Sequence, residues 1–222
     1  MSMLSTETVW NRRAATGDIV DARTYNLTIG AVLLWGFFLN YWMVQLVPVE
    51  VVQGIPPLLF LIGYVVCVIA GTSVYQGSDD PVVSFLGYNL LVVPLGLILV
   101  GMLPMYPSAV IAEAFLATGA ITTLMMFLAA GNPKFFLSIG RGLMVALICA
   151  VVVEFGFFIF TGRSPSILNW AMIAIFSGYI GYDWARAQSL PKTLDNAVDC
   201  AAALYVDIVI LFMRLLRAFS RR

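Results

Sequence analysis

The stretch ALYVDIVILFMRLLR, residues 203–217, is an apolar segment of helical length that carries a carboxylate, Asp207, near its middle. Ionisable side chains are rare inside membrane helices because an unpaired charge in hydrocarbon costs several kcal/mol. The stretch therefore raises two questions: whether the chain crosses a membrane, and what Asp207 contacts there.

Composition answers the first question. The 222 residues are 61% hydrophobic and only 11% charged, which is far more apolar than a soluble domain. Apolar runs of about 20 residues, each long enough to cross roughly 30 Å of hydrocarbon, follow one another along the chain. Pro, Gly or charged residues separate seven of them: 27–47, 56–75, 82–103, 108–130, 135–161, 166–187 and 197–219.

These runs are apolar on every face and do not alternate with polar lumen positions, which argues against a β-barrel. We therefore predict an all-α integral membrane protein: a bundle of seven transmembrane helices in residues 27–222, preceded by a polar tail in residues 1–26. The tail lacks the apolar core and the small-residue cleavage site of a signal peptide.

Positive charges predict the orientation. Arg12, Arg13 and Arg23 lie in the tail, and the next Lys or Arg is Lys134. Because Lys and Arg are enriched in cytoplasmic loops, the amino terminus is expected in the cytoplasm. Seven crossings then place the carboxyl terminus outside, although the arginines of that end favour the inside.

Residue types exclude several classes of function. The chain contains no histidine, which removes histidine-based triads, HExxH zinc sites and imidazole proton shuttles. Cys67, Cys149 and Cys200 are scattered without metal-site spacing, so neither disulfides nor zinc is expected. No phosphate loop, dinucleotide motif or basic stripe for nucleic acid is found. We therefore expect neither a cofactor nor enzyme activity. The carboxylates remain as the candidate functional side chains.

Asp207 has a candidate partner in the preceding apolar run. Asp183 lies near the end of that run, in GYIGYDWARAQ, residues 178–188. The turn between the two runs is marked by Pro191 and by Asp195, which we expect to cap the last helix. Asp183 and Asp207 are equally far from residue 195, so an antiparallel hairpin brings both carboxylates to similar depth.

Two carboxylates in a poorly hydrated place cannot both ionise cheaply, so this pair is expected to share one proton and to titrate as a unit. When ionised, the same oxygens are ligands for a hard cation such as calcium, and proton and calcium then compete. The alternative is that Asp207 pairs with Arg214, two turns along its helix, and Asp183 with Arg186.

Two other carboxylates lie in the apolar runs. Glu113 is near the start of the fourth run, where a helix dipole favours a negative charge, and Glu154 lies deep in the fifth. Both are candidate residues of an ion path. Glu154 has the alternative of pairing with Arg141, almost four turns away along the same helix.

The residues around both aspartates resemble a known family. GYDWARAQ (181–188) and LYVDIVILFMRLLR (204–217) resemble the last two helices of the Bax inhibitor-1 family, where Tyr-Asp ends the sixth helix and LYxDxxxLFxxLLR follows. The supporting positions are Tyr182, Leu204, Tyr205, Leu211, Phe212, Leu215, Leu216 and Arg217. The EAF at 113–115 is similar to the family's fourth helix. The match covers about 40 residues; elsewhere only the hydropathy pattern agrees.

This resemblance implies a bundle around a central last helix and a pH-sensitive calcium leak, with Asp183 and Asp207 as its sensor. It also implies a multi-pass protein of a bacterial inner membrane, whose partners are the lipid bilayer, calcium and protons, with no nucleic acid. Bacterial relatives carry arginines at the end of the second helix, one of which latches onto the sixth-helix aspartate. This chain has AGTSVYQGSDDP there, so a latch must use Tyr75, Gln76 or Ser78, or is missing.

Two other functions stay open. Intramembrane aspartyl proteases also place two aspartates on their sixth and seventh helices, the first within Tyr-Asp. They carry GxGD at the second aspartate and a Pro-Ala-Leu motif, whereas this chain reads LYVD and has no such tripeptide. The remaining alternative is a membrane interaction protein or modulator that transports nothing itself.

Overall fold

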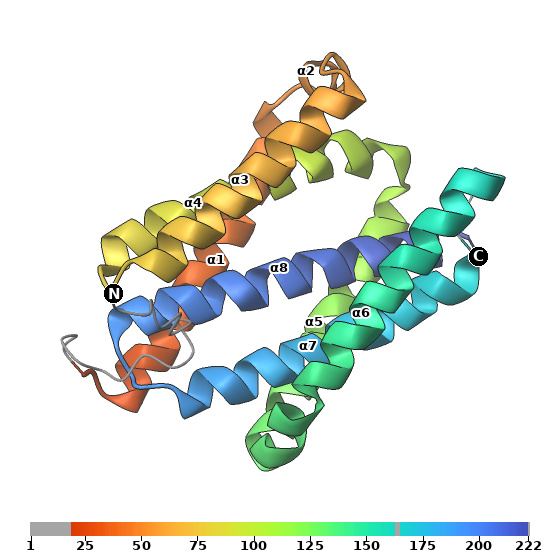
Figure 1. The fold of residues 1–222 in the computed structure, drawn as a ribbon. Coiled ribbons are helices and arrows are strands. Elements are labelled where there is room, and N and C mark those ends of the chain that lie inside the picture. Colours follow the sequence, from red (N-terminus) through yellow and green to blue (C-terminus); the bar gives the residue numbers. More distant parts are fainter. Residues whose placement is uncertain (1–18, 163–164, 222) are drawn as a thin grey trace, which may run out of the picture. The chain divides into compact units, whose positions relative to one another are not determined.

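The computed structural model describes residues 19–162 and 165–221, and this part of the chain is built from α-helices with short connections (Figure 1). In chain order they are α1 (Ala22–Leu46), α2 (Val49–Gln53), α3 (Pro57–Gly77), α4 (Pro81–Met102), the 3-10 turn η2 (Leu103–Met105), α5 (Ser108–Gly131), α6 (Pro133–Thr161), α7 (Ser166–Ser189) and α8 (Leu194–Phe219). The prediction of an all-α chain is confirmed.

Five of the described helices are long and apolar enough to cross a membrane: α1, α3, α4 together with η2, α5 and α6. Large apolar side chains on them face outward, such as Leu58 on α3 and Phe160 on α6. Contact of so large an apolar surface with water is unfavourable, and lipid would cover it in a membrane. Helices α7 and α8 have 24 and 26 residues, which is length enough to cross, but they are more polar. For these two, crossing stays a prediction, as does the central position of the last helix.

Each of the seven predicted runs coincides with a long helix, but two boundaries differ from the prediction. Helix α1 begins at Ala22, inside the predicted tail, because the Asp21 carboxylate accepts hydrogen bonds from the backbone N–H groups of Arg23 and Thr24 at 3.0 and 3.2 Å. The short helix α2 occupies a segment that was expected to be a loop. Residues 1–18 of the tail lie outside the described residues.

The start of α8 corrects the predicted helix cap. Thr193, not Asp195, has the capping role, because its Oγ1 accepts the N–H of Asn196 at 3.1 Å. Asp195 lies in the first turn, and its Oδ1 accepts a hydrogen bond of 2.6 Å from the Ser84 hydroxyl of α4. Thr193 and Asp195 are both of a residue type that caps helices, and Asp195 instead accepts the hydrogen bond from Ser84.

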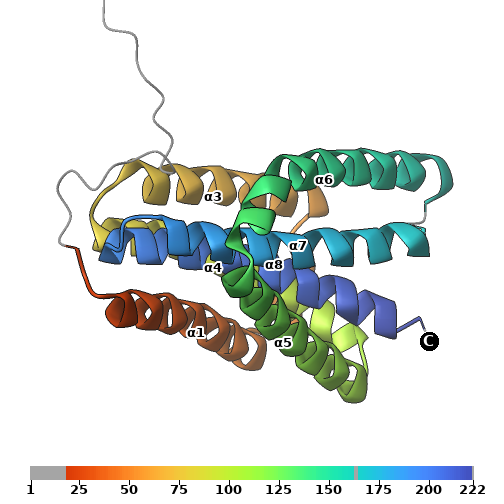
Figure 2. The same ribbon diagram turned by 90° about the horizontal axis from the view of Figure 1, so that it is seen from below.

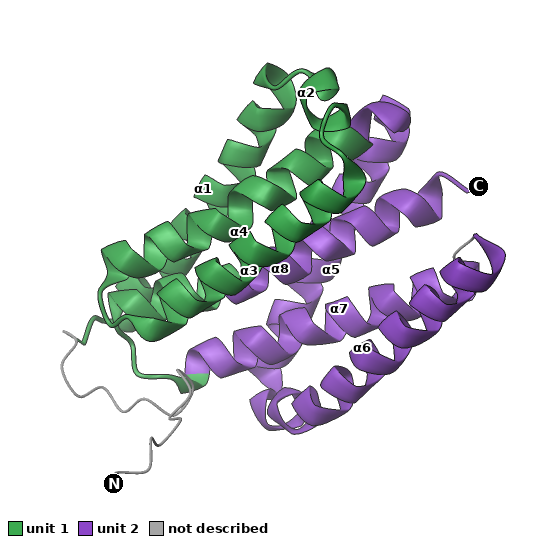
Figure 3. Cartoon of the chain, turned by 45° about the horizontal axis from the view of Figure 1, so that its top comes forward, with its two compact units in different colours: residues 1–102, 189–202 green, residues 103–188, 203–222 purple. Residues whose placement is uncertain are grey.

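The chain divides into two compact units (Figure 3). The first contains α1 to α4 and the opening turns of α8, up to Ala202. Its helices approach closely at Gly71 of α3 and Gly87 of α4, where a Cβ on Gly71 would lie 2.7 Å from the Gly87 carbonyl oxygen. The buried Tyr88 hydroxyl of α4 donates to the Val32 carbonyl of α1 at 3.0 Å. Small residues and buried hydrogen bonds therefore hold this unit together, as is common among membrane helices.

The second unit contains α5, α6, α7 and the rest of α8, from Ala203 onward. Helices α5 and α6 diverge from a short connection at Asn132 (Figure 2), whose side chain caps α6 by accepting the Phe135 N–H. Phe136 of α6 is buried with Ala129 and Ala185. A Cβ on Gly181 of α7 would overlap the Phe136 ring, so α7 lies directly against α6 at this point.

Candidate functional site: an aspartate pair

Asp183 and Asp207 lie together in the second unit. Asp183 is near the end of α7 and Asp207 is in the middle of α8, and their carboxyl groups lie close enough to interact directly. Asp207 is only 7% exposed, and its Oδ2 is buried without a hydrogen-bond partner among the described residues. Because a carboxylate can only accept, a hydrogen bond between two carboxyl groups needs one proton on the pair.

Contacts between α6 and α7 set the rotation of Asp183. The Tyr182 ring lies over Gly140 of α6, where a Cβ would overlap it, and the Phe136 ring lies over Gly181 in the same manner. Residues two positions apart in a helix are turned by about 200°, so Asp183 lies on the side of α7 opposite Gly181, away from α6. Two glycines thereby determine where the first carboxylate of the pair lies.

Two polar residues of α7 lie one turn before and one turn beyond Asp183. Arg186, one turn beyond Asp183, donates from Nη1 to the Tyr182 hydroxyl at 3.3 Å, and its guanidinium lies 5.6 Å above the centre of that ring. Tyr179 lies one turn before Asp183, and its ring packs on those of Phe176 and Tyr182. Arg186 also acts electrostatically on Asp183. The alternative pairing of Asp183 with Arg186 stays a prediction.

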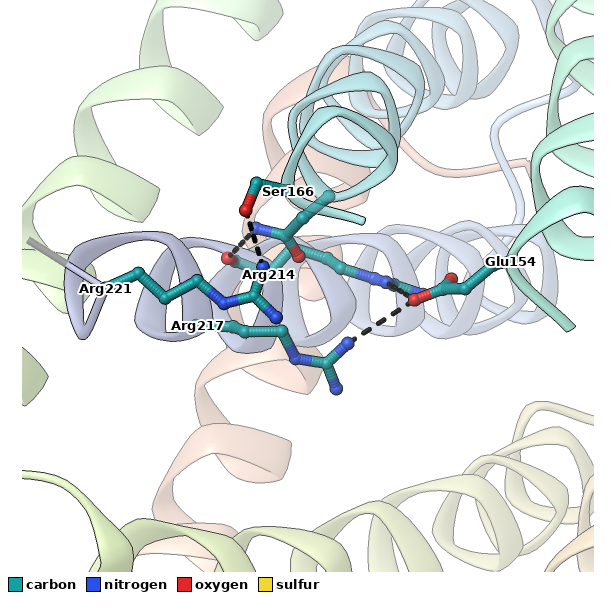
Figure 4. A network of polar contacts seen from close by, with 6 residues as sticks. Glu154, Ser166, Arg214, Arg217 and Arg221 are labelled. Carbon is teal, nitrogen blue, oxygen red and sulfur yellow. Dashed lines mark hydrogen bonds and ion pairs between the residues drawn. The ribbon is translucent and has the colours of Figure 1, made fainter. Parts of the chain in front are cut away.

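The sequence suggested Asp207 as an alternative partner of Arg214, but Arg214 contacts a different carboxylate. Its Nη1 lies 2.8 Å from Oε1 of Glu154 on α6, and the Nη1 of Arg217 lies 3.4 Å from the same oxygen (Figure 4). Glu154 is thus paired across helices with these arginines, and the proposed pairing with Arg141 is corrected. Arg141 is almost four turns from Glu154 along α6, whereas α8 brings Arg214 alongside it.

Further polar contacts at the end of α8 were not predicted. The Asn169 amide donates to the Arg214 carbonyl at 3.0 Å, and Arg221 Nη1 donates to the Ser166 hydroxyl at 2.8 Å (Figure 4). The spacing of Arg214, Arg217 and Arg221 by three and four residues is a signal that predicts one helix face. No local pattern in the sequence identifies their partners on α6 and α7.

The other candidate residues lie apart from these contacts. Glu113 is exposed on α5. In the first unit, Gln76 Nε2 donates to the Tyr75 hydroxyl at 3.5 Å. The roles of Glu113 in an ion path and of Tyr75, Gln76 or Ser78 in a latch stay predictions.

The aspartate pair offers few oxygen donors for calcium. Calcium takes six to eight oxygen ligands, and two carboxylates supply at most four. Within residues 19–162 and 165–221, no three His, Cys, Asp or Glu side chains gather that could hold a metal ion. Calcium binding by the pair stays a prediction.

Comparisons with known proteins agree with these features. The model of a family described as "Bax1-I: Inhibitor of apoptosis-promoting Bax1" matches residues 19–222. Uncharacterized membrane proteins of Streptococcus pyogenes serotypes M3, M6 and M1 are 27% identical over 123 residues, which cover 52% of this chain and 54% of each relative. The match therefore spans about half the length of these curated relatives. Together with the apolar helices, the comparisons identify an integral, multi-pass membrane protein.

Proposed function

Because the chain belongs to the Bax inhibitor-1 family, we propose that it is a pH-sensitive calcium leak with Asp183 and Asp207 as its sensor. The observation that supports the proposal is the proximity of the half-buried Asp183 and the buried Asp207. It is not an enzyme in this proposal, and it acts in a bacterial inner membrane with its amino terminus in the cytoplasm.

The mechanism follows from the shared proton. With one proton on the pair, the hydrogen bond ties the end of α7 to the middle of α8. When that proton leaves, two negative charges face each other in a poorly hydrated place, and their repulsion is strong because the surroundings screen it weakly. A divalent cation relieves this repulsion, so calcium and the proton compete for the same oxygens. Calcium flux is therefore expected to fall as the pH is lowered.

The test is calcium flux through vesicles that contain the purified full-length chain, measured over a series of pH values. Wild type is compared with Asp183→Asn and Asp207→Asn, which remove the shared proton but keep the shape of the side chain. Both variants should lose most of the pH dependence. Glu50→Gln is a matched control, because Glu50 is an exposed carboxylate on α2. If the curves of all four proteins coincide, the aspartate pair is not the sensor.

The two alternative functions make different predictions. In a protease, substrate backbone must reach the second aspartate, but Leu204 and Tyr205, just before Asp207, are fully buried, and such packing leaves no room for a peptide. A transition-state inhibitor of aspartyl proteases should therefore not bind. A modulator without transport should give no flux in vesicles that contain this chain alone, which would contradict the leak.

A further inference from the structure

Two basic residues in the first three turns of α6 have no acidic partner in the part of the chain that the structure describes. Lys134 and Arg141 are both exposed, and neither side chain makes a hydrogen bond or an ion pair with the described residues. Residues 114–153, which surround them in sequence, contain no Asp or Glu. Hydrocarbon does not solvate a charge, so each of these groups needs water or an anion from outside the chain.

The length of α6 indicates the depth of these two residues in the membrane. The helix has 29 residues and is about 43 Å long, whereas the hydrocarbon core of a bilayer is roughly 30 Å thick. Residues 142–161 are the last 20 of the helix and span about 30 Å by themselves. Their one charged side chain, Glu154, contacts arginines of α8. When this segment fills the hydrocarbon, Lys134 and Arg141 lie in the layer of the lipid headgroups.

Both basic residues share a face of α6 with exposed apolar side chains. Residues seven apart in a helix are separated by about two turns, so four exposed residues follow one another along this face: Lys134, Arg141, Ile148 and Phe155. Helix side chains lean toward the amino-terminal end, so the Arg141 guanidinium extends toward Lys134 and the headgroups. The face therefore offers positive charge at headgroup depth and, directly beside it, a surface suited to acyl chains.

We propose that Lys134 and Arg141 bind the headgroup of an anionic glycerophospholipid, whose acyl chains lie on the apolar face of α6. The Arg141 guanidinium matches two phosphate oxygens with paired hydrogen bonds, and the Lys134 ammonium adds a second positive charge. A zwitterionic lipid brings its own ammonium group, which these side chains repel. A lipid is the occupant, rather than free phosphate, because one ligand then meets both the charge and the apolar surface. Binding is independent of the aspartate pair and does not require transport.

The test is native mass spectrometry of the purified full-length chain with phosphatidylglycerol and, separately, with phosphatidylcholine. Wild type should prefer phosphatidylglycerol. Each basic residue near a membrane surface strengthens the binding of an anionic lipid about fivefold, so Lys134→Gln with Arg141→Gln should weaken phosphatidylglycerol binding about 25-fold. Phosphatidylcholine binding should stay as in wild type.

Two comparisons separate the effect of charge from misfolding. Lys134→Arg with Arg141→Lys exchanges the two side chains and keeps both charges, so it should bind phosphatidylglycerol as wild type does. Arg23→Gln is the matched control for Arg141→Gln, because Arg23 is also an exposed arginine near the start of a helix but has the Asp21 carboxylate two residues before it. Arg141→Gln should weaken phosphatidylglycerol about fivefold, whereas Arg23→Gln should leave its binding nearly unchanged. All variants should keep the helical circular dichroism of wild type.

Three results would overturn the proposal. They are unchanged phosphatidylglycerol affinity in the Lys134→Gln, Arg141→Gln protein, an equal loss in the Arg141→Gln and Arg23→Gln proteins, and displacement of the lipid by inorganic phosphate at a similar concentration. The last result would indicate a site for free anions. A preference for phosphatidylglycerol that persists in the Lys134→Arg, Arg141→Lys protein and disappears in the Lys134→Gln, Arg141→Gln protein would support the proposal.

Discussion

Gly181→Ala is the sharpest test of how the aspartate pair is positioned. Gly181 lies two residues before Asp183, at the point where α7 meets α6. A Cβ there would overlap two carbon atoms of the Phe136 ring. That ring is itself buried, packed with Ala129 and Ala185, so it has little room to move. The added methyl group must therefore push α7 away from α6.

The change in the free energy of unfolding of Gly181→Ala combines two opposing effects. Forcing an extra carbon into a packed core costs about 1–3 kcal/mol. Replacing Gly by Ala inside a helix gains about 0.5–1 kcal/mol, because Ala loses less backbone entropy on folding. The difference between the two effects is about 0–2.5 kcal/mol, and we expect Gly181→Ala to be less stable than wild type by about 1 kcal/mol. The matched control is Gly142→Ala on α6, where no neighbouring atom lies within 4 Å of the new Cβ; it should be more stable by about 0.5–1 kcal/mol.

The assay is reversible unfolding of the full-length chain in mixed micelles, followed by helical circular dichroism, with the calcium flux of each variant against pH. Gly181→Ala should also weaken the pH dependence of flux, because the displacement of α7 separates Asp183 from Asp207. If Gly181→Ala and Gly142→Ala are equally stable, α7 does not pack on Phe136 as described and the reasoning is wrong.

Two predictions concern other contacts. Ser84→Ala removes the donor to the buried Asp195 carboxylate and should lower the free energy of unfolding by about 1–3 kcal/mol in the same assay; an unchanged value would show that Asp195 does not depend on this hydroxyl. Hydrogen bonds from Thr24 hold the pKa of Asp21 below its usual value of 3.8. Because the pKa of Asp21 is lower in the folded protein than in the unfolded chain, the ionised carboxylate stabilises the fold at a pH above the unfolded-state pKa. This contribution to the free energy of unfolding should be lost as the pH falls through the folded-state pKa. Asp21→Asn should remove that acid-dependent loss, measured as unfolding against pH, and an unaltered pH profile would contradict it.

The helices and the aspartate pair were largely predictable because their signals are local. Each long helix is an apolar run that ends at Pro, Gly or a capping residue, such as Asn132 before α6. The meeting of Asp183 and Asp207 follows from a single hairpin with equal arms. For both features, the residues that decide the outcome are within about two dozen positions of each other, so spacing and helical rise are sufficient.

Other features depended on contacts between distant segments. Thr193 and Asp195 both suit a helix cap, and Ser84, 111 residues away in sequence, engages Asp195. Glu154 and Arg214 are 60 residues apart, and each had a nearer candidate partner in the sequence. The sequence alone determined which segments are apolar helices and which carboxylates lie along them. Tertiary packing decided the partners of those charges, because a side chain pairs with the group that is closest in space once α6, α7 and α8 have come together.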